Sequence, residues 1–135
     1  MGRQYCLIVP VLNGGEVWRR VVRSIQNQQP TPARVLVVDS GSNDGSDQVA
    51  VDAGFDLMRI AKTDFDHGGT RQMAADHCQE FPFLVYLTQD AELVGSGALA
   101  HLLSVFDDVS VGVAYGRQLP RLGADAIEAH ARLFN

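Results

Sequence analysis

The chain is predicted to be an α/β domain with a mostly parallel, doubly wound sheet. A short apolar run at residues 5–9, an amphipathic segment at 17–25 and a second apolar run at 35–38 follow one another closely. Strand, helix and strand in so few residues form a βαβ unit, which implies parallel strands and a right-handed crossover. The run at 83–90 stays apolar to Leu87 and then ends in Thr88, Gln89 and Asp90. This pattern is typical of a buried parallel strand whose carboxyl end meets a ligand or its metal, although Asp90 taken alone could equally cap the next segment.

Composition is that of one soluble globular domain. The 135 residues are 46% hydrophobic and 20% charged, which allows a real core. A net charge of −5 and a single lysine argue against a nucleic-acid partner, since phosphate-backbone binding needs clustered basic residues. No apolar run approaches the ~18 residues of a membrane span, and the N-terminus lacks the regions of a signal peptide. We expect a cytoplasmic protein.

The cysteines and histidines do not have the spacing of a metal site, and the only close group of arginines is expected at the surface. Cys6 and Cys78 have no neighbouring cysteine and are expected to be small buried residues, and the four histidines lack metal-ligand spacing. Arg19, Arg20 and Arg23 are expected on the solvated face of a helix, with contact to an anionic membrane surface as the alternative.

The first half of the chain gives a clear succession of elements. The strand at 5–9 is closed by residues 10–13 and a Gly-Gly pair, and apolar residues at helical spacing over 17–25 follow. The strand at 35–38 ends in Asp39, before a polar loop at 40–46. Ser46 is expected to cap a short helix that Gly54 terminates, and a third strand is expected at 55–60.

The second half begins with His67-Gly68-Gly69-Thr70-Arg71, which is expected to open another helix. Glycines directly before a helix leave backbone N–H groups that favour an anion, with a simple tight turn as the alternative. After the run at 83–90, Ser96 is expected to cap a helix whose apolar residues fall at i, i+3, i+4 and i+7. A fifth strand is expected at 111–115, a loop at 116–121 and a last helix at 124–134. We also expect that the chain has been cut after Asn135.

Polar residues follow three of the predicted strands: Asn13 the first, Asp39 the second and Asp90 the fourth. In a parallel sheet these positions meet at one edge, where one carboxylate could bind a base or ribose and another a divalent metal on a pyrophosphate. Phosphate-loop and dinucleotide fingerprints are absent, which disfavours ATPase and nicotinamide functions.

Five segments together resemble the family 2 inverting glycosyltransferases, most closely the bacterial rhamnosyltransferase branch. They are residues 8–13 (IVPVLN), 37–46 (VVDSGSNDGS), 65–71 (FDHGGTR), 87–92 (LTQDAE) and 115–120 (YGRQLP). The resemblance runs from Cys6 to the end of the chain. It implies the GT-A fold, a three-layer α/β sandwich with a nucleotide-binding first half and an acceptor-binding second half. Residues 1–135 would then be the nucleotide-sugar-binding part of a glycosyltransferase domain, truncated at its C-terminus.

The resemblance also implies roles for individual residues. Asp39 matches the aspartate that hydrogen-bonds the pyrimidine base, and Asp90 matches the aspartate that binds Mg²⁺ or Mn²⁺ on the donor diphosphate. Thr88 stands where relatives carry the first acid of Asp-x-Asp, a departure that the rhamnosyltransferase-like branch tolerates. Gly68 and Gly69 would let their loop approach the donor. The full set of nucleotide-binding residues that it implies is Pro10, Leu12, Asn13, Asp39, Ser40, Gly41, Arg71 and Gln89.

The implied reaction is displacement at the anomeric carbon of a dTDP- or UDP-sugar, such as dTDP-rhamnose, by a hydroxyl of a glycan or lipid-linked glycan. The catalytic base of the family lies beyond the position of Asn135, so the chain is expected to bind a donor without turning it over. Peripheral membrane association of the full-length protein, at the inner face of the plasma membrane, is a further implication.

Two other classes of protein, a receiver domain and a nucleotidyltransferase, agree less well with the sequence. A non-catalytic flavodoxin-like receiver domain needs an acidic pair after its first strand and a lysine after its fifth, and the segments at 11–13 and 116–117 supply neither. A nucleotidyltransferase usually opens with a glycine-rich, basic stretch, which Gly14-Gly15-Glu16 does not match.

Overall fold

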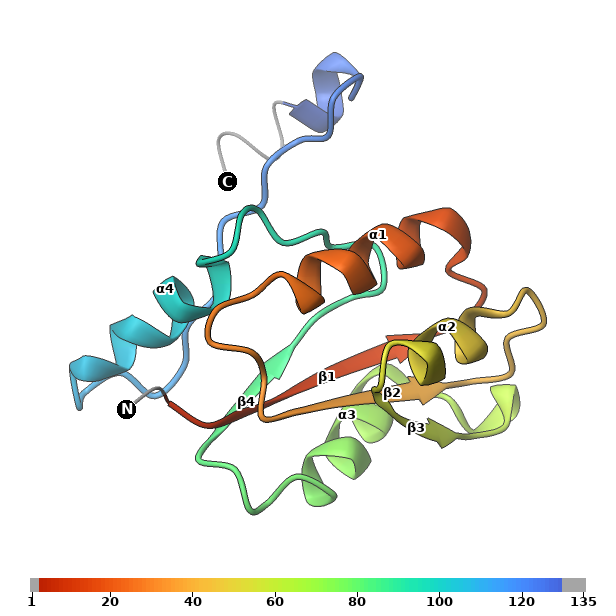
Figure 1. Cartoon of the computed structure of the whole chain (residues 1–135), viewed down its shortest axis with the longest axis horizontal. Helices are drawn as coiled ribbons and strands as arrows, with labels where there is room; N and C mark the ends of the chain where they lie inside the picture. Colours follow the sequence, from red (N-terminus) through yellow and green to blue (C-terminus); the bar gives the residue numbers. More distant parts are fainter. Residues whose placement is uncertain (1–2, 130–135) are drawn as a thin grey trace. The chain divides into compact units, whose positions relative to one another are not determined.

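A computed structural model describes residues 3–129 and shows a four-stranded sheet in the order β3-β2-β1-β4 (Figure 1). The three strand pairings are all parallel. This confirms the predicted α/β class with a parallel sheet. The chain divides into two compact units with their boundary between Ala100 and His101, and the sheet belongs to the first. The strands are β1 (Tyr5–Val11), β2 (Arg34–Asp39), β3 (Asp56–Arg59) and β4 (Phe83–Tyr86).

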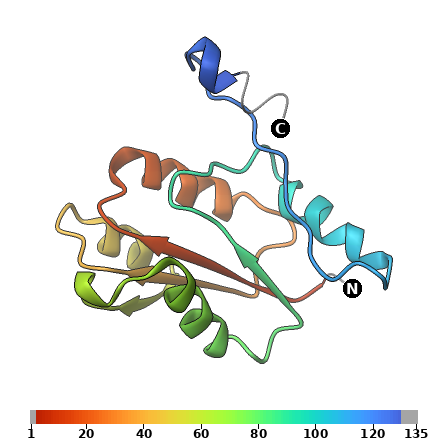
Figure 2. The same cartoon turned by 180° about the vertical axis from the view of Figure 1, so that it is seen from behind.

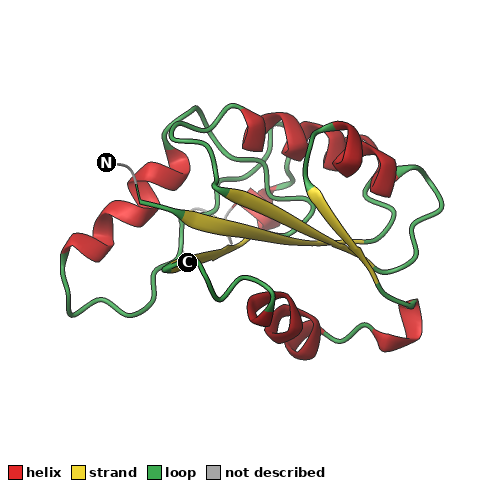
Figure 3. Cartoon of the chain, turned by 60° about the horizontal axis from the view of Figure 1, so that its bottom comes forward, coloured by secondary structure: helices red, strands yellow, loops and turns green. Residues whose placement is uncertain are grey.

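Helices cover both faces of the sheet. The helices α1 (Gly15–Gln26) and α2 (Ser46–Asp52) lie on one face, and α3 (His67–Asp76) lies on the other (Figure 3). Seen from behind, α3 stands in front of the strands (Figure 2). Strand residues point alternately to the two faces, so Cys6 and Ile8 pack with Ala74 and Cys78 on the α3 side. Leu7 and Val9 point the opposite way, and α1 buries Trp18, Val21, Val22 and Ile25.

The ends of α2 show one confirmed prediction and one correction. Gly54, in the left-handed region at φ 80°, follows the helix and ends it as expected. Ser46, however, is the first residue of α2 and makes no cap through its hydroxyl. Asp44 takes that role instead, because its Oδ1 accepts a hydrogen bond from the Ser46 N–H at 2.9 Å.

The strand that was expected to be buried on both faces is an edge strand. β4 ends at Tyr86 and pairs with β1, so Val85 is buried while Tyr86 is 44% exposed. Leu87 still donates a backbone hydrogen bond to the Ile8 carbonyl, and a turn then closes from the Ala91 N–H to the Thr88 carbonyl. Residues 88–90 therefore lie just past the strand, in a turn.

The second unit contains a further correction. The helix α4 (Ala98–Ser104) and the 3-10 turn η2 (Val105–Asp107) match the predicted apolar helix. The strand expected at 111–115 does not form, and Val113 and Tyr115 are 86% and 93% exposed. A strand needs a partner for its backbone groups, and apolar composition alone supplies none. Of the helix expected at 124–134, residues 126–129 are helical, Asp125 accepts from the Glu128 N–H, and the rest lies outside the described residues.

None of the helices within residues 3–129 is long and apolar enough to cross a bilayer.

Candidate nucleotide-binding rim

Parallel strands bring the predicted polar residues to one edge of the sheet. Val11 is in register with Asp39, and Ile8 is in register with Tyr86. Val11 and Gln89 each lie three residues further along their chains, and the Leu12 N–H donates to Gln89 Oε1 at 2.9 Å. Asn13, Asp39 and the 88–90 turn therefore follow their strands at the same carboxyl-terminal rim.

Asp39 is the most unusual side chain of this rim, because it is 3% exposed and only half satisfied. Its Oδ2 accepts hydrogen bonds from the N–H groups of Gly41 and Ser42, both at 3.0 Å. Its Oδ1 is buried and has no hydrogen-bond partner among the described residues. A buried carboxylate oxygen without a donor is costly, so this atom marks a place where a ligand N–H or O–H would be bound.

The turn after β1 and the loop after β2 are locked together by side chains. The N–H groups of Asn13 and Gly14 donate to the hydroxyls of Ser42 and Ser46, both at 2.9 Å. The Gly15 N–H donates to Asp44 Oδ2 at 3.0 Å, and Asn13 Oδ1 accepts from the Asn43 N–H at 2.8 Å. Three consecutive backbone donors are thus already used, so this turn does not form a phosphate cradle.

Trp18 packs beneath the contact between the turn after β1 and the loop after β2. Its ring is fully buried and its Nε1 donates to the Ser46 carbonyl at 3.1 Å. A Cβ at Gly14 would collide with the Trp18 side chain, which explains the glycine there. Hydrogen bonds from Ser46 and Gly15 hold the pKa of Asp44 below its usual value.

The glycines at the start of α3 do not offer the anion site that their sequence suggested. Gly68 and Gly69 lie inside α3, and their N–H groups donate to Asp66 Oδ1 at 3.0 and 3.1 Å. Asp66 also donates its own N–H to Thr70 Oγ1, which closes a reciprocal cap. The helix end is filled by the chain's own carboxylate, and a Cβ at Gly69 would meet Asp66 Oδ2.

Arg71 lies one turn into α3, where its Nη1 donates to the His67 carbonyl at 2.8 Å. Burial raises the pKa of Tyr86, and the positive charge of Arg71 is among the influences that oppose this.

Asp90 is an exposed carboxylate in that turn. No cluster of three or more acidic, histidine or cysteine side chains able to hold a metal occurs within residues 3–129. Mg²⁺ is commonly held by one or two carboxylates together with substrate phosphates, so a single carboxylate at an open rim fits a metal shared with a diphosphate.

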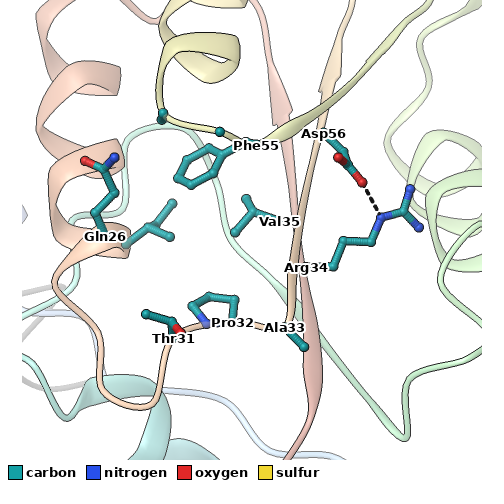
Figure 4. A pocket seen from close by; sticks show the side chains of 11 residues that line it. Gln26, Thr31, Pro32, Ala33, Arg34, Val35, Phe55 and Asp56 are labelled. Atoms are coloured by element: carbon teal, nitrogen blue, oxygen red, sulfur yellow. Dashed lines mark hydrogen bonds and ion pairs between the residues drawn. The ribbon is translucent and has the colours of Figure 1, made fainter.

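A hollow of the described chain lies away from this rim. It has a volume of about 350 Å³ and includes Arg34 and Asp56, the first residues of β2 and β3, with Phe55 and Val35 on its wall (Figure 4). Arg34 Nε and Asp56 Oδ2 pair at 2.7 Å on one side of it. This hollow is at the amino-terminal edge of the strands, opposite Asp39, and its charged groups Arg34 and Asp56 are paired with each other.

Three comparisons with known proteins agree with this geometry. Residues 6–133 match the family model described as Glycosyl transferase family 2, and the chain belongs to that family. Two curated relatives are the O-antigen chain rhamnosyltransferase RfbN of Salmonella typhimurium, 38% identical over 96% of this chain, and WbaN of Salmonella anatum, 37% identical over 97%. The matched regions are 41% and 42% of those proteins, so the chain spans about two fifths of their length.

Solved structures share the fold at lower identity. The mannosyltransferase PcManGT from Pyrobaculum calidifontis, in complex with GDP-Man and Mn²⁺, aligns with a TM-score of 0.68 and 22% identity over 83% of this chain and 34% of its own. S. aureus TarS 1–349 in complex with UDP-GlcNAc aligns with a TM-score of 0.63 and 21% identity over 87% of this chain and 37% of its own. The GT-A fold expected from the sequence is confirmed.

Several residues of the rim were missed at the level of sequence. Ser42 and Asp44 were expected only as members of the polar loop and Ser46 only as a helix cap, although small hydroxyl and carboxylate side chains at such spacing commonly bind nearby backbone donors. Asp66 directly precedes α3, which is the ordinary position of an N-cap. This position could have predicted that a carboxylate accepts the first N–H groups of the helix.

Proposed function

We propose that this chain is the nucleotide-sugar-binding part of a glycosyltransferase that transfers a sugar, with inversion, to a hydroxyl of a cell-surface glycan. The observation that carries the proposal is the buried Asp39 Oδ1 without a donor at the rim of a GT-A sheet. The two O-antigen rhamnosyltransferase relatives support rhamnose as the sugar. We propose dTDP-rhamnose as the donor.

Asp39 is proposed to recognise the base. Its Oδ2 is fixed by Gly41 and Ser42, so the carboxylate plane is set before a ligand arrives. Its Oδ1 can then accept the ring N–H of thymine or uracil. Cytosine presents a ring nitrogen acceptor at that position and would be disfavoured. Pro10, Leu12, Asn13, Ser40 and Gly41 are proposed to line the same pocket.

The diphosphate is proposed to bind at the other end of the rim. The backbone donors of residues 13–15 and of Gly68 and Gly69 are already used, and we propose that the side chains of Asp90 and Arg71 bind the diphosphate. Asp90 would hold Mg²⁺ or Mn²⁺, and the bound metal would offset charge on the leaving diphosphate. Gln89 is proposed to position this turn, since its Oε1 is bonded to Leu12. Thr88 supplies no carboxylate, so a single acid carries the metal.

The catalytic base is proposed to come from outside the described residues. Asp44 and Asp66 both accept backbone hydrogen bonds within the fold, and Glu92 lies 3.5 Å from Arg20. We propose none of these carboxylates as the base that takes a proton from the acceptor hydroxyl. We therefore expect donor binding without turnover by this chain alone. A glycan or lipid-linked acceptor, and a location at the inner face of the plasma membrane, belong to the same proposal for the full-length protein.

Ligand-dependent stability tests this function. The melting temperature should be measured with dTDP, UDP and CDP, each with and without Mn²⁺. At a hundredfold excess over Kd, a binding ligand adds about 2.7 kcal/mol, which is several degrees for a domain of this size. The substitution Asp39→Asn should abolish stabilisation with or without metal, and Asp90→Asn should remove only the part that depends on Mn²⁺. Absence of any shift with all three nucleotides would refute the proposal.

A further inference from the structure

A lysine stands beside the proposed base pocket. Lys62 is the chain's single lysine and the first residue of the 3-10 turn η1 (Lys62–Asp64). Arg59 is in register with Asp39, and the Ile60 N–H donates to the Asp39 carbonyl at 2.9 Å. The chain therefore leaves β3 at the carboxyl-terminal rim, with two residues between Arg59 and Lys62.

The stem of Lys62 lies against the loop that fixes Asp39. A Cβ placed on Gly41 would be 3.9 Å from the Cβ of Lys62, which is ordinary van der Waals contact. Gly41 is the residue whose N–H binds Asp39 Oδ2. Gly41 therefore lies close to both the Lys62 stem and the Asp39 carboxylate, whose Oδ1 has no partner among the described residues.

The ammonium group of Lys62 is available for a ligand. The side chain is exposed, and it makes no hydrogen bond or ion pair within the part of the chain that the structure describes. Nearby Arg59, by contrast, is paired with Asp47 at 3.2 Å. A flexible stem with three donors at its tip can turn toward a ligand seated on Asp39.

The two groups complement one edge of a pyrimidine. Thymine and uracil present a carbonyl, an N–H and a second carbonyl in a row, whereas cytosine replaces one carbonyl with an amino group. Asp39 Oδ1 accepts from an N–H, and the Lys62 ammonium donates to an oxygen. If Asp39 Oδ1 lies opposite the ring nitrogen, it can accept from the N–H of thymine or uracil, and a donor beside it meets a carbonyl. The ring nitrogen of cytosine carries no hydrogen and could not donate at that position.

We propose that Lys62 is a specificity-determining residue of this site, donating a hydrogen bond to the base carbonyl next to the N–H that Asp39 accepts. This inference rests on the proposed function. It adds a residue that none of the recognised motifs contains, since Lys62 falls between the second and third of them.

Selective labelling of the single lysine tests the proposal. The full chain is treated with an amine-reactive acetylating reagent, and the rate of acetylation at Lys62 is followed by peptide mass spectrometry. Saturating dTDP, UDP, thymidine or uridine should slow the reaction about tenfold, because the amine is bonded and covered. The amino terminus serves as an internal control whose rate should not change. CDP at the same concentration should leave the rate at Lys62 unaltered.

Substitutions give a second readout. Loss of one charge-assisted hydrogen bond in Lys62→Met should raise the Kd for UDP about tenfold, while Lys62→Arg should retain most of the affinity. Arg23→Met, which removes a positive charge from the last turn of α1, should leave the Kd unchanged. The ratio of the Kd values for CDP and UDP should fall in Lys62→Met.

Each outcome separates this inference from the proposed function. If UDP raises the melting temperature but Lys62 is acetylated at its original rate, the role of Lys62 is refuted and the donor site stands. If dTDP and UDP protect Lys62 while thymidine and uridine do not, the ammonium contacts phosphate, and the assignment to the base is wrong. If no nucleotide stabilises the parent chain, both proposals fail together.

Discussion

The side-chain oxygen of Gln89 accepts a hydrogen bond from the backbone N–H of Leu12 at 2.9 Å and so joins the ends of β4 and β1. β4 is an edge strand of only four residues, and this bond extends its attachment beyond the paired register. The relationship ties the turn that carries Asp90 to the turn that follows β1.

Removal of this tie should lower stability. Gln89→Ala leaves the part-buried Leu12 N–H without its partner and should reduce the free energy of unfolding by about 1 kcal/mol. Gln89→Glu keeps an acceptor oxygen in place and is the matched control. Urea denaturation measures both, and equal midpoints for Gln89→Ala and the parent chain would show that the bond contributes nothing.

The two adjacent glycines of α3 provide a matched pair of substitutions. A Cβ at Gly69 would collide with the Asp66 carboxylate, whereas a Cβ at Gly68 would lie 3.8 Å from Asp66 Oδ1, in ordinary contact. Gly69→Ala should therefore destabilise the chain by about 1–3 kcal/mol through strain and a disturbed cap. Gly68→Ala should be neutral or slightly stabilising, because alanine favours a helix interior.

Thermal or urea unfolding distinguishes the two variants. The comparison checks directly whether Asp66 fills the start of α3. Similar stability losses for Gly68→Ala and Gly69→Ala would mean that the carboxylate does not occupy the position described.

Asp44 should make the rim sensitive to acid. Hydrogen bonds lower its pKa in the folded state below the ordinary value of 3.8, so its contribution is present above that value and is lost as pH falls through the folded pKa. Asp44→Asn should flatten the loss of stability below pH 3.8, while Asp64→Asn, at an exposed position in η1, should not. Unfolding midpoints measured across the acid range test this, and identical acid profiles for both variants would contradict it.

Tyr5 should make the fold sensitive to alkali. Burial raises its pKa from 10.0 to about 12, and its hydroxyl donates to the Pro30 carbonyl at 3.0 Å. Because the pKa is raised on folding, stability is complete below pH 10 and falls as pH rises toward about 12. Burial also raises the pKa of the Cys6 thiol, which adds a loss of the same sign.

Substitution isolates the tyrosine contribution. Tyr5→Phe should reduce the slope of the unfolding free energy against pH above pH 10. The smaller slope that remains is the contribution of Cys6. Tyr115→Phe is the control, since Tyr115 is 93% exposed. An unchanged alkaline slope in Tyr5→Phe would show that the phenol is not buried in the way described.

Local periodicity accounts for what was predictable in the fold. The run at 5–9, the amphipathic pattern over 17–25 and the run at 35–38 were each decided by neighbouring residues, and β1, α1 and β2 confirm them. The parallel order then placed Asn13 and Asp39 at one rim. The strand expected at 111–115 was wrong because a strand depends on a distant partner, which composition does not reveal.

At the site, too, the sequence predicted which residue matters, but the hydrogen bonds of that residue depend on the folded arrangement. Sequence reasoning selected Asp39, but only the three-dimensional arrangement shows that Oδ2 is satisfied by Gly41 and Ser42 while Oδ1 is not. Lys62 was passed over because its closeness to Gly41 arises from the pairing of β2 with β3. Its role, like the binding roles of Arg71 and Asp90, remains a proposal.

The most direct measurement is a crystal structure of the chain with UDP or dTDP and Mn²⁺. The account predicts the pyrimidine ring N–H within about 3 Å of Asp39 Oδ1 and the metal between the diphosphate and Asp90. A nucleotide bound away from this rim, with Asp39 Oδ1 still unpartnered, would contradict it.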